Sequence, residues 1–442
     1  MQEEEQVDWP EMWAGVECTV NRVGDTYFDQ LRRSGHDLRH NDVDLIAGLS
    51  VRAVRYPVLW ERHQPPADWS WADHRLSRLR EHGVRPVVGL VHHGSGPWNA
   101  PLYEEAFAEG LAGFAADVAR RFPWVDAYTP VNEPLTTARF CGLYGHWYPH
   151  GRDDPTFVRC LLNQCRAVVL SMRAVREVRP EALLVQTDDL GQTHAPRPLR
   201  YQADFENERR WLSWDLLCGR VDRGHPLYGY LSDSGACEDE LGWFLDNPCP
   251  PDVIGINHYV TSERYLDDRT DLYPAHLRGG NARKAYVDTE AVRVLRQGGA
   301  GLQTLLQAAW DRYGIPLAVT EAHLGCTEDE QVRWLWDVWK SVLAARAGGA
   351  DVRAVTAWAV FGTFDWNSLV TREAGCYEPG AFDVRDDPPR PTPIAGLIRD
   401  LAARRTPDLP ALAEPGWWRR PERFLFPAPS RPRRPSRRAV PS

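Results

Sequence analysis

Two glutamates stand out because each directly follows a short apolar run of the kind that forms a buried strand. Glu133 follows the run over residues 127–132, and Glu321 follows the run over residues 316–320. Hydrolysis of an acetal needs one protonated carboxylic acid to donate to the leaving oxygen and one ionised carboxylate to attack or to activate water. Either glutamate alone is equally well explained as a solvated strand end or as the partner of an arginine.

Other polar and aromatic residues lie in, at the end of, or just after neighbouring apolar runs. They are Arg55, His92, His93, Asn257, Tyr259, Trp358, Asp365 and Trp366. Amide, imidazole and carboxylate groups bind sugar hydroxyls, and aromatic faces cover the C–H side of a pyranose ring, so this mixture predicts a carbohydrate site. The 19 tryptophans support that site only weakly, because most are expected in the core or between helices.

Eight apolar runs, separated by longer helix-like stretches, must position these residues. They cover residues 12–17, 53–59, 85–91, 127–132, 183–187, 253–257, 316–320 and 354–360. Their composition, without a clean alternation of polar residues, is typical of strands covered on both faces. Eight strand–helix alternations predict an α/β fold with a single closed (β/α)8 barrel, in which functional residues lie at the carboxyl ends of the strands. An open doubly wound sheet is disfavoured because no GxGxxG follows the first run.

Helix boundaries are visible between some of these runs. Asp154 followed by Pro155 is typical of an N-cap and the first helical position. Thr327 and Glu330 predict a capping box, and Gly348 is typical of the end of the same helix.

The composition of the 442-residue chain is that of a globular protein, with 43% hydrophobic and 26% charged residues. We expect one barrel domain over residues 1–414. No stretch approaches the roughly 18–20 apolar residues of a membrane span, and the mean hydropathy is -0.47, so a soluble protein is expected. The first ten residues, MQEEEQVDWP, carry acids and lead into no apolar segment, which argues against a secretory signal and predicts a cytoplasmic location.

No metal or cofactor is predicted. The nine cysteines include no CxxC pair, which is typical of reduced thiols packed as small hydrophobic side chains. The pair His92 and His93 has neither an HExxH motif nor a third ligand at a recognisable spacing. The acidic doublets at 153–154, 267–268 and 386–387 lack the pattern of a calcium-binding loop. The sequence leaves the oligomeric state open.

Charge is distributed unevenly along the chain. Residues 415–442 form a basic, Pro- and Arg-rich extension with eight arginines and one glutamate, while the whole chain carries a net charge of -9. The acidic remainder argues against a nucleic-acid-binding surface, because phosphate contacts need basic residues. The extension could bind an acidic partner, but we favour a solvated segment whose last dozen residues are disordered.

Several motifs resemble those of glycoside hydrolase family 1, the retaining β-glucosidases and β-galactosidases. TPVNEP at 129–134 resembles the family's acid/base motif, and LAVTEAH at 317–323 is similar to its nucleophile motif, 188 residues further along the chain. Further similar segments are VRYPVLW (54–60), GLVHH (89–93), DVIGINHYVTS (252–262), WAVFGTFDWNS (358–368), Arg372 and RPTP (390–393). The resemblance extends over residues 13–402 with all eight strands in order.

The resemblance implies a role for each matching residue. Glu133 is the expected general acid/base and Glu321 the expected nucleophile, with Arg55, Tyr259 and Asn257 supporting the nucleophile and Asn257 also lying near the acid/base. His92, Asn132, Trp358, Asp365 and Trp366 are the expected residues around the non-reducing sugar. We expect Arg55 to lower the pKa of Glu321 and Glu133 to have a raised pKa.

The chain also departs from the family pattern. The glutamine of the family's first-strand motif is not evident in ECTVNRVGD (17–25), where Asn21 or Glu17 are possible substitutes. Asp365 stands where the family has Glu, and His93 replaces a Trp. Ala322 and His323 replace Asn-Gly after the nucleophile. These changes leave the two glutamates in place but make glucose an unsafe assumption for the sugar.

Three functions follow from the resemblance. The first is a retaining β-glycosidase that hydrolyses a small β-glycoside through a covalent glycosyl-enzyme. The second is a transglycosidase that uses the same glutamates and an acceptor alcohol. The third is a catalytically impaired sugar-binding module, for which the missing glutamine and the Glu-to-Asp change are the arguments.

Overall fold

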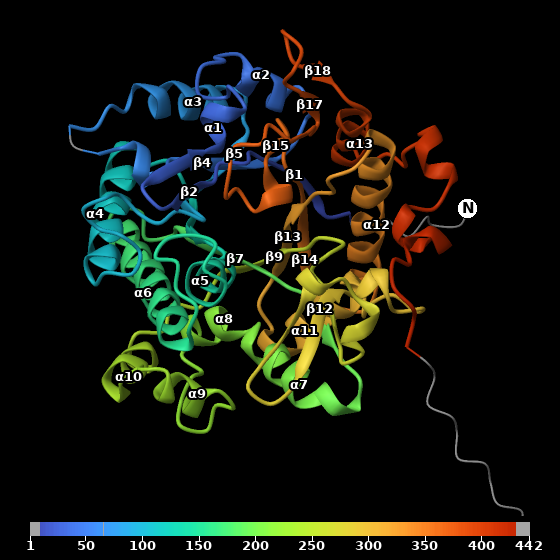
Figure 1. Cartoon of the computed structure of the whole chain (residues 1–442). Helices are drawn as coiled ribbons and strands as arrows, with labels where there is room; N and C mark the ends of the chain where they lie inside the picture. The colour runs from blue at the N-terminus through green and yellow to red at the C-terminus, as the bar shows by residue number, and fades with distance from the viewer. Residues whose placement is uncertain (1–8, 65, 430–442) are drawn as a thin grey trace, which may run out of the picture.

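The computed structural model describes residues 9–64 and 66–429, and its centre is a closed barrel of eight parallel strands (Figure 1). These strands are β1 (Glu11–Gly15), β4 (Ala53–Pro57), β5 (Arg85–His92), β6 (Ala127–Asn132), β7 (Leu183–Asp189), β9 (Val253–Asn257), β13 (Leu317–Ala322) and β14 (Val352–Ala357). Each pairs with the next in this order, and β14 pairs with β1 to close the barrel. The eight predicted runs are these eight strands, with ends that differ by at most three residues, and the predicted (β/α)8 barrel is confirmed.

Both faces of the barrel strands are covered. Every residue of β4, β6, β9 and β13 is buried, which explains why these segments show no polar alternation. A cluster of apolar side chains fills the barrel near the amino ends of the strands: Trp13, Ala53, Val87, Ala127, Val185, Val253, Ala318 and Ala354. This end is therefore packed core, and the polar groups gather at the carboxyl ends.

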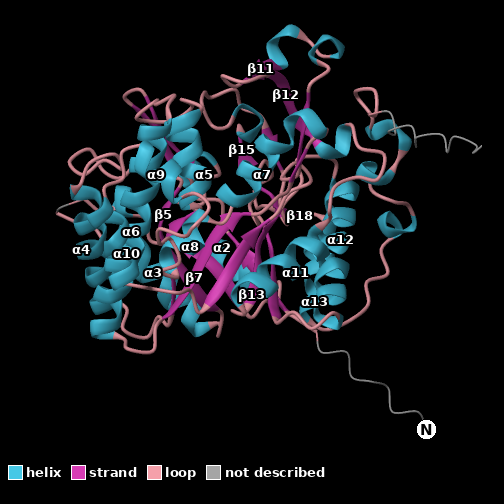
Figure 2. Ribbon diagram, turned by 90° about the horizontal axis from the view of Figure 1, so that it is seen from below, coloured by secondary structure: helices cyan, strands magenta, loops and turns pink. Residues whose placement is uncertain are grey.

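A layer of helices surrounds the strands (Figure 2). The helices are α1 (Gln30–Arg33), α2 (Asp42–Ala47), α3 (Ser70–Glu81), α4 (Ala106–Arg121), α5 (Pro134–Ala138), α6 (Asp154–Val178), α7 (Arg200–Arg209), α8 (Leu212–Leu217), α9 (Tyr228–Asp233), α10 (Glu238–Asp246), α11 (Leu302–Tyr313), α12 (Glu328–Ala347) and α13 (Pro393–Ala402). A five-residue π-helix, η2 (Arg139–Leu143), directly continues α5.

Short strands elaborate the loops that follow the carboxyl ends of the barrel strands. The strands β2 (Val20–Val23) and β3 (Thr26–Asp29) form a hairpin after β1. A four-stranded sheet is ordered β11 (Arg278–Gly280), β12 (Ala285–Glu290), β10 (Arg264–Asp267) and β8 (Thr193–His194). Two small pairs follow β14: β15 (Thr363–Phe364) with β16 (Tyr377–Glu378), and β17 (Phe382–Asp383) with β18 (Arg390–Pro391).

The helix boundaries correct two sequence predictions. The cap of α6 is Asp153, whose carboxylate accepts from the backbone N–H of Thr156, so the predicted cap at Asp154 is wrong by one residue. Thr327 does cap α12, but its side chain makes no capping hydrogen bond. The predicted capping box is absent because Glu330 instead binds the C-terminal segment.

The first part of the predicted C-terminal extension packs on the barrel. Trp418 is buried, and its Nε1 donates to Oδ2 of Asp337 on α12 at 2.9 Å. Arg423 is also buried and donates to backbone carbonyls, including that of Leu295 at 2.8 Å. The predicted disorder of the last dozen residues falls on 430–442, which lie outside the described residues.

Within the described residues, no helix is both long and apolar enough to cross a membrane.

Candidate active site

The predicted site residues come from different strands and meet at one end of the barrel. Arg55 is on β4, His92 ends β5, Asn132 ends β6, Asn257 ends β9, Glu321 is on β13, and Trp358 follows β14. Parallel strands bring their carboxyl ends to the same face, which is why residues up to 303 positions apart in this set can converge. All six side chains are buried, so the polar groups interact mainly with one another.

Glu321 is held by two donors. Arg55 Nη1 donates to Oε1 at 2.8 Å, and the phenol of Tyr259 donates to Oε2. Arg55 Nη1 also donates to the carbonyl of Thr320 at 2.8 Å, which fixes the guanidinium against β13. Both carboxylate oxygens therefore receive a hydrogen bond, an arrangement that favours the ionised form.

Glu133 lies at the turn from β6 into α5. Its φ of +48° is unusual for a residue with a side chain, and Pro134 follows at the first helical position. Oε1 of Glu133 accepts a short hydrogen bond from Asn257 Nδ2, and Oε2 lies 4.0 Å from His93 Nε2. The prediction grouped Asn257 with the residues that support Glu321, but the side chain of Asn257 contacts Glu133.

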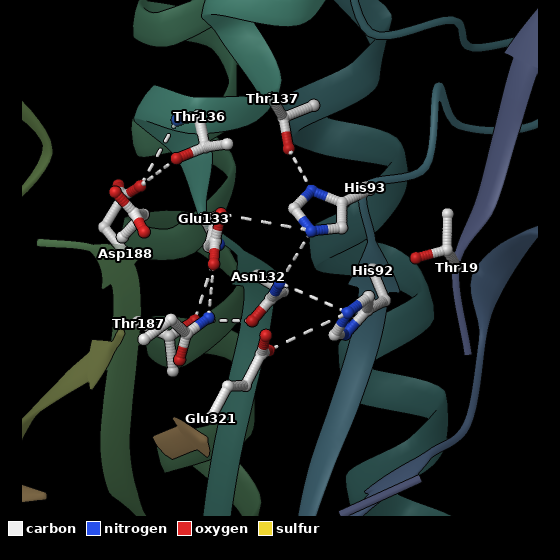
Figure 3. A network of polar contacts seen from close by, with 12 residues as sticks. Thr19, His92, His93, Asn132, Glu133, Thr136, Thr137, Thr187, Asp188 and Glu321 are labelled. Carbon is white, nitrogen blue, oxygen red and sulfur yellow. Dashed lines mark hydrogen bonds and ion pairs between the residues drawn. The ribbon is translucent and has the colours of Figure 1, made fainter. Parts of the chain in front are cut away.

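A polar network joins the two glutamates (Figure 3). Arg55 links Glu321 to Asn132, the residue before Glu133, because its Nη2 donates to Oδ1 of Asn132 at 2.6 Å while its Nη1 binds Glu321. His92 Nε2 lies 3.9 Å from Glu321 Oε1 and accepts from Asn132 Nδ2 at 3.3 Å. Asn257 is the strand partner of Glu321 and reaches Glu133 with its amide. The structure thus brings the two carboxyl groups to one site.

Burial raises the pKa of both glutamates, and their different neighbours make the two pKa values differ. Burial raises the pKa of Glu133 well above its ordinary value, and the negative charges of Glu321, Asp189 and Asp188 raise it further. Burial also raises the pKa of Glu321, while Arg55 and Tyr259 lower it and so offset part of the increase. The expected lowering of the Glu321 pKa by Arg55 is therefore confirmed, although burial outweighs it and the net shift is upward. Glu133 has no cationic hydrogen-bond partner in the described structure, so it is the more readily protonated of the two.

The two histidines of the site are neutral at physiological pH. Burial lowers the pKa of His92 well below its ordinary value, with further lowering by His93 and Arg55. Burial and Arg55 lower the pKa of His93 to about 3. Asn132 Nδ2 lies 3.3 Å from Nε2 of each ring, so both nitrogens can act as acceptors.

Aromatic and acidic residues form the rest of the site. The ring of Trp358 stacks on His92, with centroids 5.2 Å apart and planes at 9°, and its Nε1 donates to Glu17 at 3.2 Å. Trp366 contacts the ring of His93 edge-on at 5.6 Å. The carboxylate of Asp365 accepts from Arg33 Nη2 and from the backbone N–H of Cys376, both at 2.8 Å.

The two possible substitutes for the missing glutamine differ in their contacts. Glu17 touches Trp358, as described above. Asn21 is buried, donates from Nδ2 to the carbonyl of Val370 at 2.9 Å, and leaves Oδ1 without a partner in the described structure. His323, one of the departures after Glu321, binds the carbonyl of Trp358 and the carboxylate of Glu378, both at 2.9 Å.

Sequence reasoning missed a residue behind Glu133. Asp188 is fully buried at the end of β7, and its oxygens accept from the N–H groups of Leu135 at 3.0 Å and Thr136 at 3.2 Å, and from Ser213 Oγ at 2.7 Å. It therefore binds the start of α5, the helix that begins after Glu133. The strand-end rule could have found it, since Asp188 and Asp189 directly follow the predicted strand 183–187.

Among the described residues, no group of three or more His, Cys, Asp or Glu side chains is arranged to hold a metal ion.

Comparisons with known proteins agree with this architecture. No protein-family model matches the chain. It is 26% identical over 388 residues to beta-glucosidase 4 of Oryza sativa subsp. japonica, covering 76% of this chain and 77% of the relative. It is 25% identical over 402 residues to thermostable beta-glucosidase B of Thermobispora bispora, covering 80% and 78%.

A solved structure of the family 1 beta-glucosidase of Thermotoga maritima superimposes with a TM-score of 0.70 at 15% identity, covering 90% of this chain and 99% of that one. The predicted enzyme class, glycoside hydrolase, is confirmed. The resemblance predicted from the sequence is confirmed as well, because the chain is similar in sequence to β-glucosidases and in fold to a family 1 β-glucosidase.

Proposed function

We propose that this protein is a retaining β-glycosidase that hydrolyses a small β-glycoside by double displacement. The observation that carries the proposal is the pair of buried carboxyl groups at one site, one held by Arg55 and Tyr259 and the other bound by the neutral amide of Asn257. The retaining mechanism needs this asymmetry, because one group must attack as an anion while the other donates a proton.

In the first step Glu321 attacks the anomeric carbon, and the bond from that carbon to the leaving oxygen breaks. Glu133 gives its proton to that oxygen, so the aglycone leaves as a neutral alcohol. The products of this step are a glycosyl ester of Glu321 and an ionised Glu133. The raised pKa of Glu133 favours the protonated acid at the start of the step.

In the second step Glu133 acts as the base. Esterification removes the negative charge of Glu321, which is one cause of the raised pKa of Glu133. Glu133 then becomes a stronger acid in the ester form and is ionised, ready to take a proton from water. Water attacks the anomeric carbon, the ester bond breaks, and Glu321 is released as a carboxylate with the sugar in its original anomeric configuration.

The remaining predicted residues are proposed to bind the non-reducing sugar. Asn132 lies beside both glutamates, so its amide can bind the 2-hydroxyl, a contact that strengthens in the oxocarbenium-like transition state. His92, Trp358, Asp365 and Trp366 supply an acceptor, a ring face, a carboxylate and a second ring. The carboxylate of Asp365 already binds Arg33, which supports a sugar preference different from that of an enzyme with a free carboxylate there.

The test is turnover of aryl β-glycosides of several sugars, followed by azide rescue. Glu321→Gly is expected to lose activity and, with added azide, to give the glycosyl azide of inverted configuration. Glu133→Ala with azide is expected to give the retained product from a substrate with a good leaving group. Equal behaviour of wild type and Glu321→Gly on every sugar contradicts the proposal and leaves a sugar-binding module.

Hydrolysis and transfer use the same two carboxylates, so an added alcohol separates them. Sugar released to water as the main product supports the glycosidase. A transfer product that dominates at low alcohol concentration identifies a transglycosidase instead.

A further inference from the structure

A half-buried arginine that has no partner in the described structure follows Glu133 closely in the chain. Arg139 begins η2, six residues after Glu133 and directly after α5. Among the described residues, its side chain has no hydrogen bond and no ion pair within 4.0 Å, and its Nε is fully buried without a partner. Arg55 and Arg33, the arginines on the sugar side of the site, both pair with carboxylates. A guanidinium without a protein partner keeps its N–H donors available to a ligand.

The carboxyl groups near Arg139 are bound to other donors. Burial lowers the pKa of Arg139, but Tyr144, Asp189, Asp188 and Glu133 raise it by more, so the guanidinium stays charged. Asp188 is occupied by the N–H groups of α5 and by Ser213, and Asp189 accepts from Ser262 Oγ. These acids keep Arg139 protonated without using its N–H donors.

Arg139 lies on the leaving-group side of the site. Glu133 protonates the glycosidic oxygen, so the aglycone extends past Glu133 and away from Glu321. Figure 3 shows Thr136 and Thr137 of α5 on the side of Glu133 opposite to Asn132 and Glu321. The chain continues from these threonines through Ala138 into Arg139, the first residue of η2.

The other cation near Tyr144 is already paired. Tyr144 raises the pKa of Arg264 as well as that of Arg139, so both cations are near it. Arg264 Nε, however, donates to Asp288 at 2.8 Å. Tyr144 itself is 39% exposed, so this region reaches the surface. Of these two cations, Arg139 is the one that has no carboxylate partner in the described part of the chain.

Resting on the proposed function, we propose that Arg139 binds a carboxylate on the aglycone, so that the preferred substrates are β-glycosides of acidic alcohols or phenols. A planar guanidinium binds a carboxylate through two parallel hydrogen bonds. A single negative charge fits better than the two of a phosphate monoester, because Asp188, Asp189 and Glu133 already act on this one unpaired cation. The step needs no chemistry beyond that of the two glutamates.

The experiment compares a 4-carboxyphenyl β-glycoside with the 4-carbamoylphenyl β-glycoside of the same sugar. We expect Arg139→Gln to lower the ratio of kcat/KM for acid over amide by about 10-fold or more, the usual effect of losing a charge-assisted hydrogen bond. The ratio cancels the difference in leaving ability, because each substrate is compared with itself in both proteins. Arg139→Lys is expected to give an intermediate ratio, since lysine keeps the charge and loses the two-pronged geometry.

The matched control is Arg52→Gln. Arg52 is exposed and precedes β4, at the amino end of the strands, so its loss should leave the ratio unchanged. A second readout needs no variant: rising salt should weaken the wild-type preference for the acid and leave the amide unaffected. An unchanged ratio in Arg139→Gln, or a salt-independent preference, overturns the inference.

The same compounds separate this inference from the proposed function. Hydrolysis of the amide with no preference for the acid overturns only the role of Arg139. If neither compound is hydrolysed, the proposed function fails, and calorimetric binding of both compounds still tests Arg139. Tighter binding of the acid that is lost in Arg139→Gln supports the inference, while equal or absent binding contradicts it.

Discussion

Removing the hydroxyl of Tyr259 tests whether Glu321 acts as an anion. Tyr259→Phe keeps the ring and deletes the donor to Oε2, leaving Arg55 as the remaining hydrogen-bond donor to the carboxylate. A hydrogen bond to a charged group contributes about 1.5–3 kcal/mol. At about 1.4 kcal/mol for each factor of ten in rate, kcat/KM should fall by about 10- to 150-fold.

The pH profile of the same variant tests the direction in which the pKa of Glu321 changes. Tyr259 lowers the pKa of Glu321, so its loss raises that pKa. A nucleophile must be ionised, and activity is lost as the pH falls through its pKa, so the acidic limb of kcat/KM should move to higher pH. The assay is the kcat/KM of an aryl β-glycoside across the pH range.

Tyr128→Phe provides a matched control. Tyr128 is a fully buried residue of β6 whose hydroxyl has no hydrogen-bond partner in the described structure, so its removal should leave activity and the acidic limb unchanged. A loss below about twofold for Tyr259→Phe, with its acidic limb unmoved, would refute the reasoning.

Three further predictions concern charge and packing. Asp188→Asn removes a negative charge that raises the pKa of Glu133, so the alkaline limb of kcat/KM should move to lower pH. The control Ser213→Ala removes a hydrogen bond to Asp188 but keeps its charge, so it should leave that limb in place. Glu133→Gln should raise the Tm at pH 7 more than at pH 4. The pKa of Glu133 is raised in the folded protein, and such a group costs stability only above its unfolded pKa of about 4.3. An equal change in Tm at both pH values contradicts this prediction. Trp418→Ala should lower the Tm and leave kcat/KM unchanged, because loss of a buried Trp costs about 3 kcal/mol of stability. Leu425 is 62% exposed, so Leu425→Ala should change neither quantity. Equal Tm values for the two variants contradict this prediction.

The barrel was predictable because its signal is local. Strands buried on both faces appear in the sequence as short apolar runs, and each is followed by the polar residue that reaches the mouth. The rule places Glu133 and Glu321 directly after two predicted runs, without any knowledge of long-range contacts.

The contacts that the sequence could not predict join distant segments. Asp365 pairs with Arg33, 332 residues earlier, and nothing in either local sequence indicates the pairing. Glu330 is diverted from its predicted capping role by the backbone N–H of Trp417, 87 residues later. Tertiary partners of this kind override local patterns because they satisfy groups that the local structure would otherwise use.

The pKa of Glu321 shows a different limit. The sequence predicted its cationic neighbour, and Arg55 does bind it, but the net direction depends on how completely the site is closed. Burial is a property of the assembled loops over the barrel mouth, so the opposing contribution becomes visible only in three dimensions.

Covalent trapping of the nucleophile tests the central claim most directly. The protein is incubated with a 2-deoxy-2-fluoro-β-glycoside that has a good leaving group, on the sugar that the wild type hydrolyses, and its proteolytic peptides are analysed by mass spectrometry. We predict one fluoroglycosyl ester, on Glu321, that disappears in Glu321→Gln. An ester on any other residue, or inactivation without an ester, would contradict the assignment of Glu321 and Glu133 to one anomeric carbon.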